Sequence, residues 1–273
     1  MLKRTEGIVL KTFPFGEADL IVTYLTPDYG IIKFFAKSPR KIKSRFGSSL
    51  EPLTRSKISF WGKEEAALPR LTQSDIIHPF QSLRDNLRCF LKLSEIIELT
   101  VSFIPERDIN NKAYSLLLVT LQDIENNLAE FPLSKKGNEE DSLRDKSGLT
   151  GRELLLNHYK TKFLELVGFA PKFDVCGRCT KKGHHYYLSQ GSILCEQCAR
   201  VEAARTDIGP PIKLSPPVQR FYADLLTWDT AKIKRIKPSE RLLSEFSDII
   251  NMHIQYILSK PLKSGAFIKF MTR

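Results

Sequence analysis

The sequence has no long hydrophobic run. Polar breaks such as KTFPFG and PDYG keep every apolar segment well below the roughly 18 to 20 residues that span a membrane. The basic start, MLKRTEGIVLKTF, contains neither a long apolar core nor a small-residue cleavage site, so it lacks the pattern of a secretory signal. We therefore expect a cytoplasmic protein that has no membrane partner.

Cysteine is scarce outside one short stretch. Four of the five cysteines fall between residues 176 and 198, and Cys89 stands alone in an apolar segment. This is a poor pattern for a secreted disulfide framework, so reducing conditions are the simpler inference. We predict that Cys89 is a buried core residue without a function of its own.

The chain also lacks common catalytic motifs. It contains no G-x-x-x-x-G-K-[ST] loop, no Ser/His/Asp order and no acidic metal cluster. We therefore predict that the protein is not an enzyme, and in particular that it has neither ATPase nor nuclease activity.

Positive charge, by contrast, is abundant. The 273 residues include 42 Lys and Arg against 31 Asp and Glu, which gives a formal net charge of +11. With 42% hydrophobic and 27% charged residues, the composition is that of a soluble globular protein. The charge excess favours a polyanionic partner, and nucleic acid more than a membrane surface.

The first 80 residues have the pattern of a small β-barrel. Runs rich in β-branched and aromatic residues are separated by turn signals, which predicts five short strands. The predicted strands are 7–13, 19–26, 30–38, 53–61 and 67–77. Five strands at this spacing, ending near Pro79, indicate a closed or nearly closed barrel that forms a domain over residues 1–80.

After Pro79 the hydrophobic period changes to that of helices. The predicted helices are 82–104, 111–130, 153–169, 217–228 and 239–258. The polar stretch 133–148 has little to bury and is predicted to be a mobile loop, and 210–217 is predicted to be a proline-rich connector. The fold class is thus α+β: a barrel followed by a helical domain over 81–273, with a cysteine-containing insertion at about 173–201.

Two C-x-x-C pairs define the insertion. Their spacing is C-x2-C-x15-C-x2-C, in which two knuckles close a tetrahedral four-thiolate shell around zinc. The four predicted ligands are Cys176, Cys179, Cys195 and Cys198. We predict one structural Zn²⁺ per chain, because a filled shell leaves no open position for a catalytic water. Vestigial or redox-active cysteine pairs are the alternatives.

The residues between the pairs do not favour zinc catalysis. A zinc deaminase needs H-x-E ahead of its P-C-x-x-C, whereas Tyr186 and Tyr187 follow the two histidines here. We interpret His184 and His185 as residues of a solvated loop, and ligation of the metal is the alternative.

A basic segment begins in the third predicted strand. Residues 33–50 contain no acidic residue and six cations: Lys33, Lys37, Arg40, Lys41, Lys43 and Arg45. Strand alternation places Phe35 on the same face as Lys33 and Lys37, and it directs Arg55 and Lys57 of the next strand away from the core. Cations beside an aromatic ring suit single-stranded nucleic acid, which needs charge for its phosphates and a ring for base stacking. We predict DNA contacts at these nine residues.

The alternative for the basic segment is a solvated edge whose lysines protect a strand from aggregation. A second basic cluster lies at 232–241 and contains Lys232, Lys234, Arg235, Lys237 and Arg241. It either extends the DNA-binding surface or is the solvated flank of a helix.

This combination of features resembles the bacterial recombination mediator family RecO. The similarity runs through residues 7–52, where GE-x-D precedes a strand, a T-x-x-x-G turn spans Thr26 to Gly30, and a basic K-S segment precedes a leucine. It continues through FLELVGFAPKFDVCGRC and the second C-x-x-C, to about residue 200. Ser38 departs from the family pattern, in which glycine is expected after the lysine.

The resemblance implies an N-terminal OB-fold followed by a helical domain that carries zinc. It also implies a non-enzymatic role at the bacterial nucleoid: binding single- and double-stranded DNA, annealing complementary strands, and acting with RecR to load RecA onto DNA coated by single-strand-binding protein. The acidic C-terminal tail of single-strand-binding protein is an implied partner, for which a basic and apolar groove on the helical domain is expected. The alternative function is a protein adaptor that recruits a repair partner and has only incidental DNA affinity.

Overall fold

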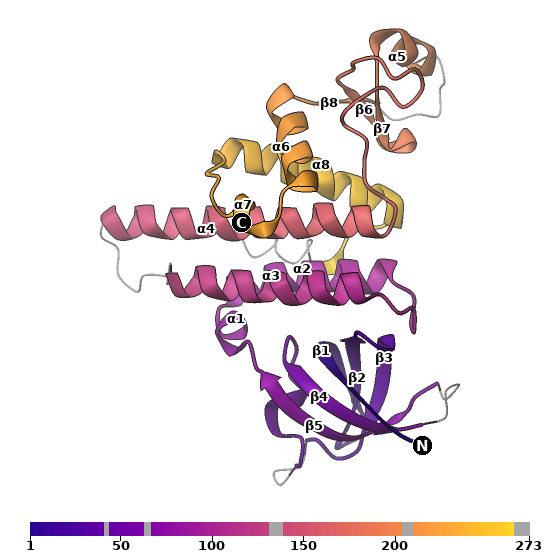
Figure 1. Ribbon diagram of the computed structural model, residues 1–273, viewed down its shortest axis with the longest axis vertical. Coiled ribbons are helices and arrows are strands. Elements are labelled where there is room, and N and C mark those ends of the chain that lie inside the picture. The colour runs from indigo at the N-terminus through magenta and orange to yellow at the C-terminus, as the bar shows by residue number, and fades with distance from the viewer. Residues whose placement is uncertain (41–43, 63–66, 131–138, 204–209, 265–273) are drawn as a thin grey trace. The chain divides into compact units, whose positions relative to one another are not determined.

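A computed structural model describes residues 1–40, 44–62, 67–130, 139–203 and 210–264 (Figure 1). Within 139–203 it describes the side chains of residues 148–202. The chain forms two compact units, Met1–Glu125 and Asn126–Arg273. The change from strands to helices falls between His78 and Gln81, as the sequence pattern indicates. The first helices nevertheless group with the barrel, so the first unit extends about 45 residues beyond it. The predicted domain boundary at 80/81 stays a prediction.

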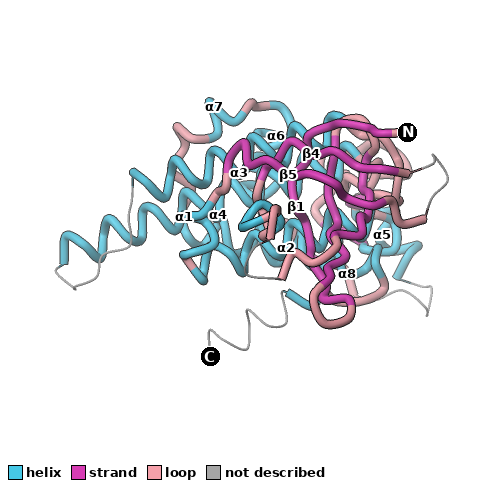
Figure 2. Tube along the Cα trace, turned by 90° about the horizontal axis from the view of Figure 1, so that it is seen from below, coloured by secondary structure: helices cyan, strands magenta, loops and turns pink. Residues whose placement is uncertain are grey.

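The first unit contains a closed five-stranded barrel (Figure 2). Its strands are β1 (Leu2–Phe15), β2 (Asp19–Thr26), β3 (Gly30–Ala36), β4 (Arg55–Trp61) and β5 (Arg70–His78). The strand order is β1-β2-β3-β5-β4, and β3 and β5 form a parallel pair while the other neighbours are antiparallel. The predicted barrel is confirmed, although β1 begins at Leu2 rather than Gly7 because its first half pairs with β4.

Strand alternation places the barrel core as expected. Phe34 and Ala36 of β3 are fully buried with Ile58 of β4, whereas Lys37 and Lys57 are exposed. The 3-10 helix η1 (Gly47–Leu50) lies between β3 and β4 and adds buried apolar side chains to the same core. One face of each strand is therefore committed to packing. The other face is partly accessible in the second half of β3 and in β4, whereas residues 8–10 of β1 and 22–26 of β2 are buried on both faces.

The T-x-x-x-G turn between β2 and β3 has a physical reason for its two fixed residues. The Thr26 hydroxyl donates to the Gly30 carbonyl at 3.0 Å and accepts from the Tyr29 N–H at 3.0 Å. Gly30 has φ +61°, and a Cβ built there would lie 2.0 Å from the Asp108 carbonyl oxygen. Only glycine fits this close approach of two backbones.

The helices of the first unit are α1 (Gln81–Asp85), α2 (Leu87–Phe103) and most of α3 (Asn111–Glu130). A single helix was predicted over 82–104, and the structure divides it at Asn86. The reason is capping: Asn86 leaves the helical conformation, and its side-chain oxygen accepts from the Cys89 N–H at 3.0 Å. Cys89 is buried, as predicted.

The second unit contains the longer helices α4 (Glu139–Leu166) and α8 (Glu240–Leu258), together with α6 (Pro216–Thr227) and α7 (Thr230–Ile233). The prediction of a loop over 133–148 is wrong for residues 139–148, which form the start of α4, while its first six residues lie outside those described. A polar segment can still be helical when it extends a packed helix, since propagation costs less than nucleation. Among the described residues no helix combines the length and the apolarity needed to cross a membrane.

The cysteine insertion is a small module of its own. It contains β6 (His185–Tyr187), the 3-10 helix η2 (Leu188–Gln190), β7 (Ser192–Leu194), α5 (Glu196–Ala203) and β8 (Ile212–Lys213). The strands form a three-stranded sheet in the order β7-β6-β8, so the predicted connector at 210–217 supplies one of its strands. Phe173, Tyr186 and Tyr222 pack together at ring distances of 4.9 and 4.6 Å and join the module to α6.

Candidate metal centre and nucleic-acid interface

The two C-x-x-C pairs meet in the folded module. The first pair lies in the loop before β6, and the second lies at the end of β7 and in α5. All four sulfur atoms lie within 4.8 Å of one another, with 3.5 Å between the sulfurs of Cys179 and Cys195 and 3.7 Å between those of Cys198 and Cys179. All four cysteines are free thiols. The four cysteines that the spacing predicts as ligands therefore lie together in the folded module.

The spacing of these sulfurs fits a four-coordinate metal. Zinc–sulfur bonds of about 2.3 Å in a tetrahedron place the sulfurs about 3.8 Å apart, which is close to the separations found here. The group of candidate ligands among the described residues consists of the four cysteines without a histidine or carboxylate. Such a set can hold a soft or borderline dication and fills its tetrahedral shell.

The backbone fixes the first cysteine pair. The Cys176 N–H donates to the Lys181 carbonyl at 2.8 Å, and the Cys176 carbonyl accepts from the Thr180 N–H at 3.0 Å. Gly177 donates to the Ile193 carbonyl at 3.0 Å, and a Cβ at this position would lie 2.3 Å from the Ser192 hydroxyl oxygen. Glycine at this position lets the loop approach β7 closely enough for the two pairs to share one centre.

The thiols of the centre have unequal acidities. Burial raises the pKa of Cys176, but the backbone N–H groups of Cys195, Arg178 and Cys179 donate to its sulfur and lower the pKa to about 6. Hydrogen bonds with the sulfurs of Cys179 and Cys195 raise the pKa of Cys198 to about 12. Without a cation the cluster therefore keeps at least one proton at neutral pH, and metal binding would release it.

Neither histidine belongs to the group of candidate ligands: His184 precedes the module sheet and His185 is part of it. His184 is exposed, its Nδ1 lies 3.3 Å from Gln219 Oε1, and its carbonyl accepts from the Leu214 N–H. The prediction of a loop is wrong for His185, which belongs to β6 and pairs with Leu194 and Lys213. Two neighbouring strands satisfy its backbone, which explains why this residue is extended.

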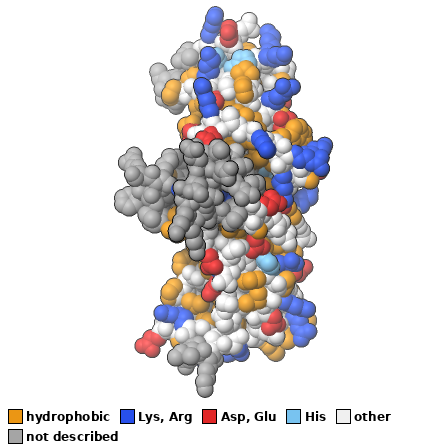
Figure 3. Space-filling model, turned by 90° about the vertical axis from the view of Figure 1, so that its left-hand side faces the viewer, with side chains coloured by type: hydrophobic (Ala, Val, Ile, Leu, Met, Phe, Trp, Pro, Cys, Tyr) orange, Lys and Arg blue, Asp and Glu red, His pale blue; other side chains and the backbone are white. Residues whose placement is uncertain are grey.

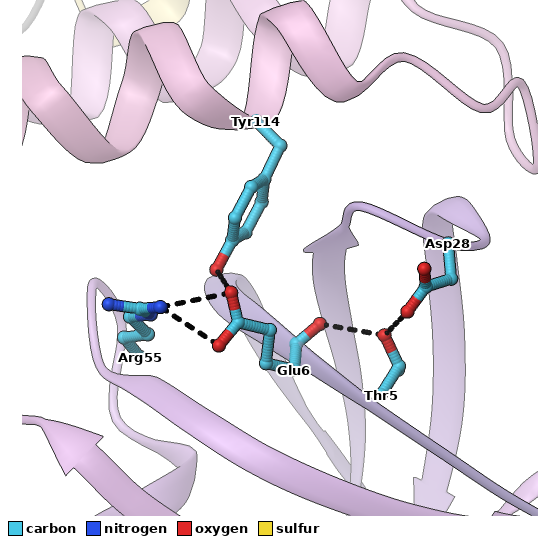
Figure 4. A network of polar contacts seen from close by, with 5 residues as sticks. All are labelled: Thr5, Glu6, Asp28, Arg55 and Tyr114. Atoms are coloured by element: carbon cyan, nitrogen blue, oxygen red, sulfur yellow. Dashed lines mark hydrogen bonds and ion pairs between the residues drawn. The ribbon is translucent and has the colours of Figure 1, made fainter.

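Two of the predicted DNA contacts on the barrel already have acidic partners. Lys33 forms an ion pair with Glu106. Arg55 forms a two-oxygen ion pair with Glu6 at 2.9 and 3.0 Å, and the Tyr114 hydroxyl donates to the same carboxylate at 2.8 Å (Figure 4). Sequence reasoning missed this network, because Glu6, Arg55 and Tyr114 come from β1, β4 and α3. DNA contact through Lys33 or Arg55 stays a prediction, and it competes with these ion pairs.

The other predicted contacts lie on the outside of the barrel. Lys37, Arg40 and Lys57 are exposed. None of these three side chains forms an ion pair with a carboxylate within the described parts of the chain. Arg45 lies over the Phe46 ring, 4.9 Å from its centre. Phe35 is half-buried and meets Phe15 edge-on at 5.9 Å. Two predicted contacts, Lys41 and Lys43, lie outside the described residues.

The second basic cluster is divided between α7, the following connection and the first turn of α8. All five cations are exposed: Lys232, Lys234, Arg235, Lys237 and Arg241. Figure 3 shows one face of the molecule, on which Lys and Arg side chains are spread out with Asp and Glu among them. Charge alone therefore does not single out a binding surface on this face, and local geometry must do so.

The second unit also contains a cavity of about 1090 Å³ between the turn after α4, the η2–β7 turn and the end of α8. Phe169, Met252 and Tyr256 line it and are 47%, 39% and 49% exposed. Its described lining includes Lys172 and Lys260 and neither Asp nor Glu. The cavity thus combines apolar surface with positive charge.

Comparison with known proteins identifies relatives of the whole chain. Residues 1–80 match the family description "Recombination protein O N terminal", and residues 141–266 match "Recombination protein O C terminal". The chain is 39% identical over 255 residues to "DNA repair protein RecO" of Thermodesulfovibrio yellowstonii, which covers 93% of this chain and 92% of the relative. It is 30% identical over 268 residues to the protein of the same name in Syntrophus aciditrophicus, covering 96% and 93% of the two chains. The Dehalococcoides mccartyi protein is 28% identical over 275 residues, or 99% and 96% of the two chains.

Proposed function

The chain belongs to the RecO family of DNA repair proteins, and from that membership we propose that it is a non-enzymatic mediator of recombination. In this role it binds single- and double-stranded DNA and anneals complementary strands. With RecR it helps to load RecA onto DNA that is coated by single-strand-binding protein. We place this activity in the bacterial cytoplasm, at the nucleoid.

The observation that carries the proposal is the outer face of the closed barrel. Lys37, Arg40 and Lys57 are exposed there and form no ion pair among the described residues. Lys37 lies two residues from the half-buried Phe35, whereas Lys57 lies opposite Glu6 and Asp75 in the strand register. A cationic surface lowers the repulsion between two phosphate backbones and raises the local concentration of strands. Base pairing then supplies the free energy of annealing, so the protein needs no group that makes or breaks bonds.

The metal centre has a structural role in this proposal. We assign Zn²⁺ to the four thiols of the centre, because the sulfur separations and ligand number fit a closed zinc site. Bound zinc would tie the loop before β6 to β7 and α5, and it would leave no position for a reacting water.

Strand annealing tests the proposed function most directly. We expect the protein to accelerate pairing of two complementary labelled oligonucleotides, both when they are bare and when they are coated by single-strand-binding protein. Pairing at the spontaneous rate under both conditions would contradict the proposal. Metal-dependent cleavage of either strand by purified protein would contradict its non-enzymatic character.

A salt series tests the assignment of the DNA-binding surface. Lys37→Ala combined with Arg40→Ala should lower affinity for a single strand and reduce the slope of log affinity against log salt by about 1.4, since each phosphate contact contributes about 0.7. Lys232→Ala combined with Arg235→Ala removes the same charge from the second basic cluster. An unchanged slope makes this variant the matched control, and a reduced slope would extend the DNA-binding surface to that cluster. Equal slopes for wild-type protein and the barrel variant would contradict the assignment to the barrel.

The cavity of the second unit favours a further partner contact. Its two lysines and three partly exposed apolar side chains suit a short acidic peptide that ends in an apolar residue. We propose that it receives the C-terminal tail of single-strand-binding protein. Tyr256→Ala or Lys260→Ala should weaken binding of a labelled tail peptide, and a scrambled peptide is the control. Unchanged peptide affinity in both variants would place the tail elsewhere.

An adaptor with incidental DNA affinity is the second candidate function, and the same cavity favours it. The mediator must bind DNA through the barrel cations and anneal strands, whereas the adaptor needs only to bind its protein partner. If the tail peptide binds but the salt series shows no dependence on barrel cations and annealing is absent, the adaptor is the better description.

A further inference from the structure

The outer face of the barrel has three exposed aromatic side chains besides Phe35, the one aromatic residue among the predicted DNA contacts. Phe13, Phe15 and Trp61 are 54%, 52% and 55% exposed, although large aromatic side chains usually contribute to cores. None of the three belongs to the barrel core. Because the barrel is closed, they do not guard a free strand edge either. Singly exposed apolar side chains are common, so what matters is whether these three share one contiguous surface.

Strand register aligns these side chains in one row. Phe13 of β1 lies opposite Ile21 of β2, which lies opposite Phe35 of β3. Phe35 in turn lies beside Arg70 of β5, and Arg70 lies opposite Trp61 of β4. Register partners point to the same face of a sheet, so this aromatic row crosses all five strands on the outside.

The neighbouring rows confirm the orientation of the aromatic row. One position along, Ala36 of β3 pairs with Leu71 of β5, which pairs with Phe60 of β4, and all three are buried. With strands about 4.8 Å apart, the row extends about 19 Å from Phe13 to Trp61. This length suits several successive bases rather than one.

Cations accompany the row on the same face. Arg70 is a member of it, Lys37 is two positions from Phe35, and Lys11 is two positions from Phe13. None of these three pairs with a carboxylate in the described part of the structure. The Arg40 N–H donates to the Ala18 carbonyl at 3.2 Å, which holds this residue beside the β1–β2 turn. Two acidic side chains also lie at this end: Asp19 accepts from the Ser38 N–H at 2.7 Å, and Glu17 is exposed in the β1–β2 turn.

From this arrangement we propose that the aromatic row, with Phe15 packed against it, is a base-stacking platform for single-stranded DNA. The inference rests on the proposed function and adds the chemistry of recognition to it. Rings stack on the faces of unpaired bases, and the flanking cations contact the phosphates between them. Bases in a duplex are already stacked on one another, so the aromatic row selects single strands.

The test separates base contacts from phosphate contacts. Phe13→Leu combined with Trp61→Leu removes two rings and keeps apolar side chains of similar bulk at exposed positions. The ligands are a labelled thymidine oligonucleotide, an abasic oligonucleotide of equal length and a duplex. We expect affinity for the first to fall about 30-fold or more, since each of the two removed rings contributes about 1 to 3 kcal/mol, and affinity for the other two to stay within about twofold.

Tryptophan fluorescence gives a direct readout of stacking. The chain has two tryptophans, so Trp228→Phe leaves Trp61 as the sole emitter. Single-stranded oligonucleotide should quench this emission, and the abasic oligonucleotide should not. Leu87→Ala is the control variant, because Leu87 is 59% exposed in the same unit and lies outside the aromatic row.

The outcomes distinguish this inference from the proposed function. If wild-type protein binds single strands but the double variant binds them equally well, or Trp61 emission does not respond, the platform is wrong and DNA binding stands. If the affinities for all three ligands fall together, the rings support the fold rather than contact bases. If wild-type protein binds none of the ligands, both proposals fail. Quenching by RecR and not by DNA would make the row a protein-docking surface.

Discussion

The metal centre and the aromatic row are assembled in different ways. The four thiols come from residues 176–198 and meet in a small module, whereas the row collects side chains from five strands between residues 13 and 70. In the metal centre every member is needed to complete one coordination shell. In the row each ring makes a separate contact. Loss of one member should therefore be severe in the first region and graded in the second.

The largest effect is expected from the metal centre. Cys176→Ser removes one of four ligands, so the protein should lose its zinc and the second unit should lose at least about 3 kcal/mol of unfolding free energy. Zinc content measured with a chelating dye and chemical denaturation check this. DNA affinity per folded molecule should change little, because the proposed contacts lie on the barrel.

Cys89→Ala is the matched control for this prediction. It removes a buried cysteine of the first unit that is remote in sequence from the metal centre, so zinc content should stay at one per chain. If Cys176→Ser retained its zinc, Cys176 would not be a required ligand. If its DNA affinity per folded molecule fell together with its stability, the metal centre would also contribute to DNA binding.

The next effect separates packing from recognition within the barrel. Arg55→Ala leaves the partly buried Glu6 carboxylate without its ion-pair partner and should lower stability by about 1 to 2 kcal/mol. Lys57→Ala, two residues along the same strand at an exposed position, should leave stability nearly unchanged and weaken DNA binding instead. Urea denaturation and oligonucleotide titration of both variants measure this. If Arg55→Ala lost DNA affinity at unchanged stability, Arg55 would belong to the DNA contacts.

The same contrast explains what could be predicted from the sequence. Ligand spacing in the cysteine module is local, so the chain order of Cys176 to Cys198 was enough to identify the metal centre. Period-two alternation likewise predicted five strands and the buried face of β3. These features depend on neighbours within about twenty residues, for which sequence patterns are informative.

The features that sequence reasoning missed depend on pairing between distant segments. The neighbours of Phe35 in the aromatic row follow from the parallel pairing of β3 with β5, which no local pattern specifies. Tyr114 reaches Glu6 from α3 across more than a hundred residues. The division of the predicted helix at Asn86 did have a local signal, since asparagine is a preferred N-cap residue.

A smaller effect concerns pH and the second unit. Burial lowers the pKa of His253, whose Nδ1 lies 2.6 Å from the Tyr186 hydroxyl and whose Nε2 lies 2.8 Å from the Phe169 carbonyl. Below the ordinary pKa of about 6.5 the unfolded chain binds a proton that the folded chain resists, so stability should fall as pH drops. The slope for this one group cannot exceed about 1.4 kcal/mol per pH unit.

Denaturation between pH 5.5 and 7.5, with zinc in excess, measures this contribution. His253→Asn should flatten the pH dependence relative to wild-type protein, whereas His184→Asn at an exposed position should not. Identical slopes for all three proteins would show that His253 does not contribute to the pH dependence of stability.

The smallest expected effect lies at the edge of the aromatic row, at Ser38, where the resemblance to the family led us to expect glycine. Its φ of +59° is in the left-handed region, which favours glycine, and its N–H donates to Asp19 in a bond that does not require the side chain. Ser38→Gly should therefore raise stability by about 0.5 kcal/mol, after the greater chain entropy of unfolded glycine is subtracted. Ser38→Ala loses the hydroxyl without gaining that freedom, so it should not stabilise. Equal unfolding free energies for both variants and the wild-type protein would mean that this turn stores no backbone strain.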